Sequence, residues 1–98
     1  MAFTDIYDFF MLKNEAEHLV LHELEKQLGT VTRPICVCNE CVVDMAAVAL
    51  NMVKPKYRFS LLGTLYAAQA MNEQAYADSV QRAVANAIEK VSNNPSHD

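Results

Sequence analysis

The sequence predicts a mostly α-helical domain of three to four helices with a short irregular or β-like connector. Three observations predict this class. The chain has 98 residues and 52% of them are apolar, so it can bury a modest core. Only two glycines and three prolines interrupt it, and alanine is abundant, which favours helix. Apolar residues also recur at helical spacing. We expect residues 1–98 to form one domain, with a core over about 10–92 and a tail over 93–98.

The first helix is expected to run from about residue 4 or 5 to residue 28. Thr4 can cap its start, and Gly29 is a natural stop. Because Asn14 is itself a good N-cap, the pattern also allows a break or bend there. The apolar face of this stretch consists of Phe9, Leu12, Ala16, Leu19, Val20, Leu24 and Leu28.

The second helix is expected from about residue 39 or 40 to residue 53, after a loop over residues 30–35. Pro34 disfavours helix before this point, and Pro55 ends the second helix. This helix is apolar nearly all round, which is typical of a helix at the centre of a domain or at a subunit interface. The β-branched and aromatic residues over 57–66 then indicate two short strands or an irregular connector.

The last helix has the clearest pattern. Asn72 is a candidate N-cap, although helical spacing reaches back to about Leu65, and residues 92–95 stop the helix. One apolar stripe is expected to face the core: Ala77, Val80, Ala83, Val84, Ala87, Ile88 and Val91.

The charge distribution points to a small anionic ligand. A net charge of −4 argues against binding to a long nucleic acid. Yet Lys54, Lys56 and Arg58 fall within five positions, and Arg33 lies shortly before the second helix. A local basic patch on an acidic protein suits a small anion better than a long polyanion.

The sequence lacks the features that would indicate export, a membrane span or enzymatic activity. The first ten residues carry acids where a signal peptide has basic residues, and no run reaches the roughly 20 apolar residues of a membrane span. We therefore expect a cytoplasmic protein, in which thiols stay reduced. We find no ordered catalytic triad, no glycine-rich phosphate loop and no evident acid pair, so we expect no enzyme.

All three cysteines, Cys36, Cys38 and Cys41, lie within six residues at the mouth of the second helix. Their spacing favours a structural zinc site, with Cys41 in the first helical turn, where the helix dipole favours thiolate. A redox pair formed by Cys38 and Cys41 is a second interpretation, and thiols without a shared task are a third. A zinc site with three cysteines lacks a fourth ligand. The candidates are water, a group from a second subunit, His18, His22 and Asp44.

These residues resemble a known family. The order and spacing of twelve positions resemble the signature of the ComFB family, named after a late-competence protein of bacteria. Residues 14–20 and 91–95 resemble its first helix and its C-terminal end, so that the resemblance covers about residues 10–96. The twelve positions are Cys36, Cys38, Cys41, Asp44, Met45, Ala47, Ala49, Leu50, Asn51, Val53, Pro55 and Tyr57.

The resemblance implies a mostly helical homodimer that binds a cyclic dinucleotide, cyclic di-GMP or cyclic di-AMP, with the cysteines as a structural zinc site. Such a ligand needs cations for two phosphates and planar groups for its bases. The candidate binding residues are Arg33, Lys54, Lys56, Tyr57 and Arg58.

Two other interpretations stay open. The basic segment, residues 54–59, is also compatible with a solvated connector, with Tyr57 and Phe59 packed into the core. The alternative function is a zinc-stapled dimeric adaptor that binds a protein partner and no nucleotide.

Overall fold

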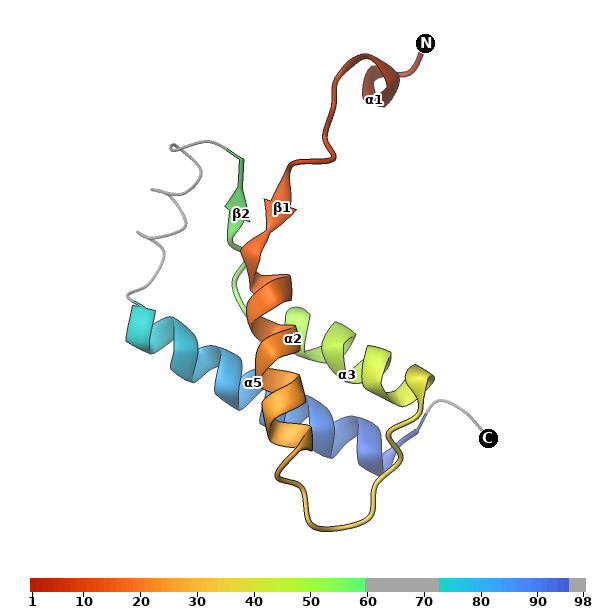
Figure 1. Cartoon of the computed structure of the whole chain (residues 1–98), viewed down its shortest axis with the longest axis vertical. Coiled ribbons are helices and arrows are strands. Elements are labelled where there is room, and N and C mark those ends of the chain that lie inside the picture. Colours follow the sequence, from red (N-terminus) through yellow and green to blue (C-terminus); the bar gives the residue numbers. More distant parts are fainter. Residues whose placement is uncertain (60–72, 96–98) are drawn as a thin grey trace.

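The computed structural model describes residues 1–59 and 73–95 of the chain. Within these ranges the fold is mostly helical, with four helices and a small antiparallel sheet (Figure 1). The helices are α1 (Phe3–Ile6), α2 (Glu15–Leu28), α3 (Asn39–Leu50) and α5 (Glu73–Asn93). Strands β1 (Lys13–Asn14) and β2 (Tyr57–Arg58) pair with each other. The predicted mostly helical fold is confirmed, including the β-like start of the connector. The expected helix start near Leu65 and the Asn72 cap lie outside the described residues.

The core forms where α2, α3 and α5 pack on one another. Figure 1 shows α2 crossing α5, with α3 beside both helices. Helix α3 contacts both of the other helices, but Val43 on its outer face is 58% accessible, so α3 is not buried all round as a central helix would be. The described core residues are Ala16, Val20, Leu24, Cys41, Met45, Ala46, Ala49, Val53, Tyr76, Val80, Ala83, Val84, Ala87, Ile88 and Val91.

The first predicted helix is wrong over its N-terminal half. The chain forms only the short α1, leaves helical structure after Ile6 and starts α2 at Glu15. Asn14 causes the break, because it is the N-cap of α2 and also pairs with β2. Phe9 and Leu12, which we expected on the buried face, are exposed as a result.

The other two long helices differ from expectation in detail. Helix α3 ends at Leu50, earlier than predicted, and the side chain of Asn51 donates a hydrogen bond to the Ala47 carbonyl at 2.8 Å. Helix α5 ends as predicted, but its buried stripe starts with Tyr76, which is 2% accessible, and Ala77 is exposed. No helix among the described residues is long and apolar enough to cross a membrane.

Replacing Asn14 by alanine should lower the free energy of unfolding by about 2 kcal/mol, because two hydrogen bonds are lost. Its Oδ1 atom accepts from the backbone N–H of Ala16 at 3.1 Å and of Lys56 at 2.7 Å. Urea denaturation measures the change. Asn86→Ala is the control, since Asn86 is an exposed asparagine within α5. Equal stability of the two variants would contradict the role assigned to Asn14.

Candidate functional site

The three cysteines form a compact cluster at the start of α3. Their Sγ atoms all lie within 4.8 Å of one another. Cys38 is the N-cap of α3, and its Sγ accepts from the backbone N–H of Cys41 at 3.5 Å. Cys41 is fully buried in the core, Cys36 is half-buried and Cys38 is exposed. The cluster therefore joins the helix start to the core and reaches the surface at Cys38.

The pKa values of Cys36 and Cys41 are shifted in opposite directions by their surroundings. The pKa of Cys36 is lowered, first by the backbone N–H of Cys38 and then by the thiols of Cys38 and Cys41. Burial raises the pKa of Cys41 to about 12, and the two neighbouring sulfurs add to this effect. A thiol binds a metal as thiolate, so a metal at this cluster would take the place of protons.

The donor set fits a soft metal ion. Tetrahedral zinc with Zn–S bonds of about 2.3 Å holds two sulfurs about 3.8 Å apart, so the cluster would need only a small inward shift. Among the described residues, His18, His22 and Asp44 do not join the three sulfurs. Of the fourth ligands considered, water and a group from a second subunit remain. The cluster could thus hold a metal ion with three protein ligands and one open position.

The basic segment is held firmly against α2. Its backbone pairs with β1 in the register Lys13 to Arg58 and Asn14 to Tyr57. The Lys56 carbonyl accepts from the Glu15 N–H at 2.7 Å, in addition to the bond between the Lys56 N–H and Asn14. These contacts fix Lys56 and the strand that carries Tyr57 and Arg58.

Tyr76 of α5 supports the same segment from the core. Its hydroxyl donates to the Lys54 carbonyl at 2.6 Å. The Nζ atom of Lys56 lies 4.3 Å from the centre of the Tyr76 ring, a cation–π contact. Burial raises the pKa of Tyr76, so its hydroxyl remains a donor at neutral pH.

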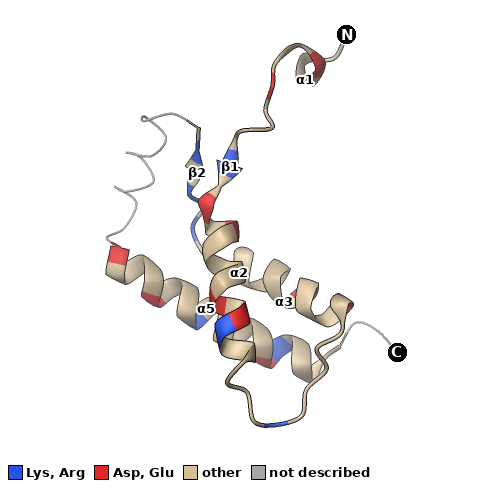
Figure 2. Cartoon of the chain, viewed as in Figure 1, with Lys and Arg blue, Asp and Glu red and all other residues tan. Residues whose placement is uncertain are grey.

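The outer side chains of this segment face solvent. Lys54, Tyr57 and Arg58 are exposed, and β1 adds the exposed Lys13 (Figure 2). With Lys56, half of the chain's eight Lys and Arg residues lie in the β1–β2 sheet or within three residues of it. The alternative in which Tyr57 and Phe59 pack into the core is wrong, because these side chains are 55% and 72% accessible.

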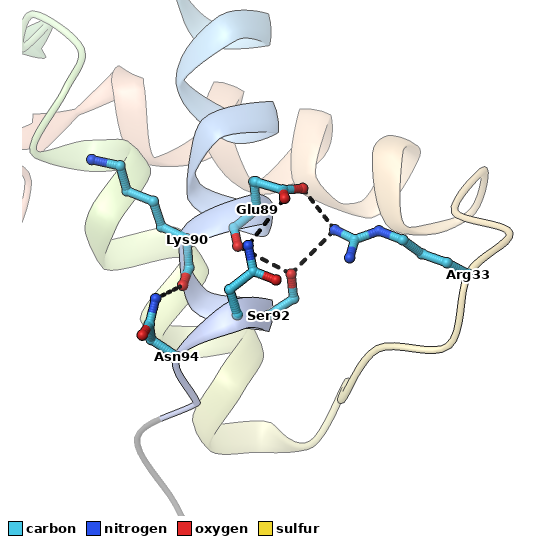
Figure 3. Close-up of polar contacts among 6 residues, drawn as sticks. Arg33, Glu89, Lys90, Ser92 and Asn94 are labelled. Carbon is cyan, nitrogen blue, oxygen red and sulfur yellow. Dashed lines mark hydrogen bonds and ion pairs between the residues drawn. The ribbon is translucent and has the colours of Figure 1, made fainter.

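Arg33 lies at the other end of α5. Its guanidinium forms an ion pair with Glu89 at 2.8 Å and donates to the Ser92 hydroxyl at 3.2 Å (Figure 3). Glu89 lies thirteen positions after Tyr76 along α5, or about 20 Å at 1.5 Å per residue. Within one chain, Arg33 is therefore not brought to the other candidate ligand residues.

A hollow of about 310 Å³ lies between α2 and α5, beside the basic segment. Sequence spacing does not reveal this hollow, because its walls come from two helices that only the tertiary fold brings together. The i, i+3 and i+4 spacing along each helix was the available signal. The lining residues are Leu19, His22, Glu23, Lys56, Glu73, Tyr76, Ala77 and Val80.

Comparisons with known proteins agree with this fold. The family model described as late competence development protein ComFB matches residues 13–95. The solved structure of the late competence protein ComFB from Bacillus subtilis superposes with a TM-score of 0.67 at 24% identity. The match covers 88% of this chain and 93% of that one. A search of curated proteins gives no match. Because the family model matches most of the sequence, the chain belongs to the ComFB family.

Proposed function

We propose that this protein is a non-enzymatic cytoplasmic receptor for a cyclic dinucleotide, cyclic di-GMP or cyclic di-AMP. It acts as a homodimer, and its cysteine cluster is a structural zinc site. The observation that carries the proposal is the position of the basic segment. Exposed cations stand on a sheet fixed to α2 and α5, directly beside an apolar hollow.

The parts of the ligand match the parts of this surface. The two phosphates need cations, which Lys54, Lys56 and Arg58 supply. The exposed ring of Tyr57 offers a face on which a base can stack. The hollow beside Lys56 can receive a planar base out of water. One small patch therefore offers groups for both the phosphates and the bases of the ligand.

A second copy would complete the site. A cyclic dinucleotide has two similar halves, and a two-fold dimer offers two similar basic segments. Arg33 joins such a site only from the second copy, because it lies about 20 Å along α5 from the basic segment of its own chain.

Replacing Arg58 by alanine should raise the dissociation constant for the cyclic dinucleotide about tenfold or more, because a charged contact to phosphate is lost. Lys56→Ala should act in the same direction. Calorimetric titration with cyclic di-GMP and cyclic di-AMP measures both variants. The control is Arg82→Ala, which removes an exposed arginine from α5. The proposal fails if the unchanged protein gives no heat with either nucleotide at micromolar concentration.

A zinc-stapled dimeric adaptor is the second candidate function. It is favoured by the exposed apolar segment before β1, which projects away from the helices in Figure 1. Accordingly the radius of gyration is 15.8 Å, against about 13 Å for a compact domain of this length. If the protein binds neither nucleotide in the titration, that result would favour the adaptor function. The exposed large apolar residues of the segment are Met1, Phe3, Ile6, Tyr7, Phe9, Phe10, Met11 and Leu12.

A further inference from the structure

The hollow between α2 and α5 contains a carboxylate whose position is fixed. Glu23 is half-buried on α2, and its Oε2 atom accepts from the Nε2 of Gln27 at 2.8 Å. The same Gln27 amide donates to the Gln81 carbonyl of α5 at 3.0 Å. Glu23 is thus tied through Gln27 to both walls of the hollow, so its carboxylate is oriented before any ligand arrives.

The rest of the hollow suits a flat aromatic ring. Leu19 and Val80 give it apolar walls, and the lining is mostly apolar. Its volume of about 310 Å³ lies at the lower end of the roughly 300–1,000 Å³ found for small-molecule sites. Lys56 lines the hollow and also belongs to the basic segment. A nucleotide whose phosphate contacts Lys56 can therefore place its base in the hollow.

A fixed carboxylate distinguishes guanine from adenine. An ionised carboxylate only accepts hydrogen bonds, and its two oxygens match two neighbouring donors. Guanine presents such a pair, the N1–H and the exocyclic N2 amino group. Adenine presents an acceptor at N1, which a carboxylate repels. A buried polar contact of this kind discriminates strongly because the wrong base leaves it unpaired.

We propose that Glu23 recognises a guanine base in this hollow and makes the protein selective for cyclic di-GMP over cyclic di-AMP. This inference rests on the proposed function and adds to it the base and the residue that selects it. Glu23 acts through direct contact with the ligand, and Gln27 is a positioning residue that orients its carboxylate.

The test is Glu23→Gln, which keeps the size of the side chain and removes its charge. We expect the dissociation constant for cyclic di-GMP to rise about ten- to hundredfold, while that for cyclic di-AMP changes less than about threefold. Glu25→Gln is the matched control, because Glu25 is an exposed glutamate of the same helix that does not line the hollow. It should affect both nucleotides equally and weakly. Calorimetry gives the constants, and circular dichroism checks the fold.

The outcomes separate this inference from the proposed function. Unchanged selectivity in Glu23→Gln overturns the inference, while binding by the unchanged protein still supports a receptor. A preference of the unchanged protein for cyclic di-AMP also overturns the inference and still supports a receptor. Absence of binding to either nucleotide overturns both. Loss of cyclic di-GMP binding alone, in Glu23→Gln but not in Glu25→Gln, supports the inference.

Discussion

Replacing Cys38 by serine is expected to abolish the stabilisation of this protein by zinc. The three sulfurs lie within 4.8 Å of one another. Because the cluster has only these three cysteines, the loss of one sulfur leaves two cysteine ligands for the metal. Zinc that binds only the folded state stabilises it by about 2.7 kcal/mol at a hundredfold excess over the dissociation constant. The unchanged protein should show this gain and carry about one zinc per chain. The variant should show neither.

Cys38 is the informative cysteine to change because the fold tolerates serine there. Its sulfur caps α3 through the Cys41 N–H, and serine is among the preferred N-cap residues. Buried Cys41 lacks this advantage, since a hydroxyl in the core would itself be costly. Without zinc, Cys38→Ser should therefore be at least as stable as the unchanged protein. The order should reverse when zinc is added.

Thermal denaturation with and without zinc, together with metal analysis of protein purified without chelator, measures this reversal. Val37→Ser is the control, because Val37 is exposed between two of the cysteines and carries no metal-binding group. It should keep the zinc response. Equal zinc content in Cys38→Ser and the unchanged protein would contradict a metal site at the cluster.

The parts of the fold that the sequence predicts well depend on local spacing. The apolar stripe of α5 follows from residues three and four apart along one helix, and the end of α5 follows from the stop residues 92–95. The wrong first helix shows where this reasoning stops. Residues 7–12 have helical spacing, but Asn14 is bound by β2, which comes more than forty residues later. Tertiary pairing thus overrode a local pattern, as it commonly does for helix propensity.

In the candidate site, too, the residues that lie close together in sequence were predicted, and those that only the tertiary fold brings together were not. The cysteine cluster lies within six residues, so its spacing alone brought the three sulfurs to notice. Arg33 also lies close to the cysteines in sequence, yet it pairs with Glu89 at the far end of α5. Glu23 and Tyr76 gave no functional signal, because the hollow exists only where α2 meets α5. Contacts between distant segments are what sequence spacing does not reveal.

Tyr76 is the residue through which the core and the basic segment depend on each other. It is 2% accessible, donates to the Lys54 carbonyl and lies under the Lys56 ammonium group. Tyr76→Ala should lower the free energy of unfolding by about 3–5 kcal/mol, since a large buried ring is lost. That is a major part of the roughly 5–15 kcal/mol that stabilises a typical domain. Binding of the cyclic dinucleotide should weaken at the same time, because the segment loses its support.

Two further variants separate these effects. Tyr76→Phe keeps the ring and its contact with Lys56 but removes the hydroxyl, so we expect a loss of about 1 kcal/mol and a small change in affinity. Met45→Ala removes another fully buried side chain, at a cost of about 2–5 kcal/mol, from a residue that does not line the hollow. Urea denaturation and nucleotide titration under folding conditions measure both quantities. If Met45→Ala weakens binding as much as Tyr76→Ala does, the loss of affinity reflects general destabilisation. A loss confined to Tyr76→Ala would mean that Tyr76 itself contributes to ligand binding, through its support of the basic segment and its place in the wall of the hollow.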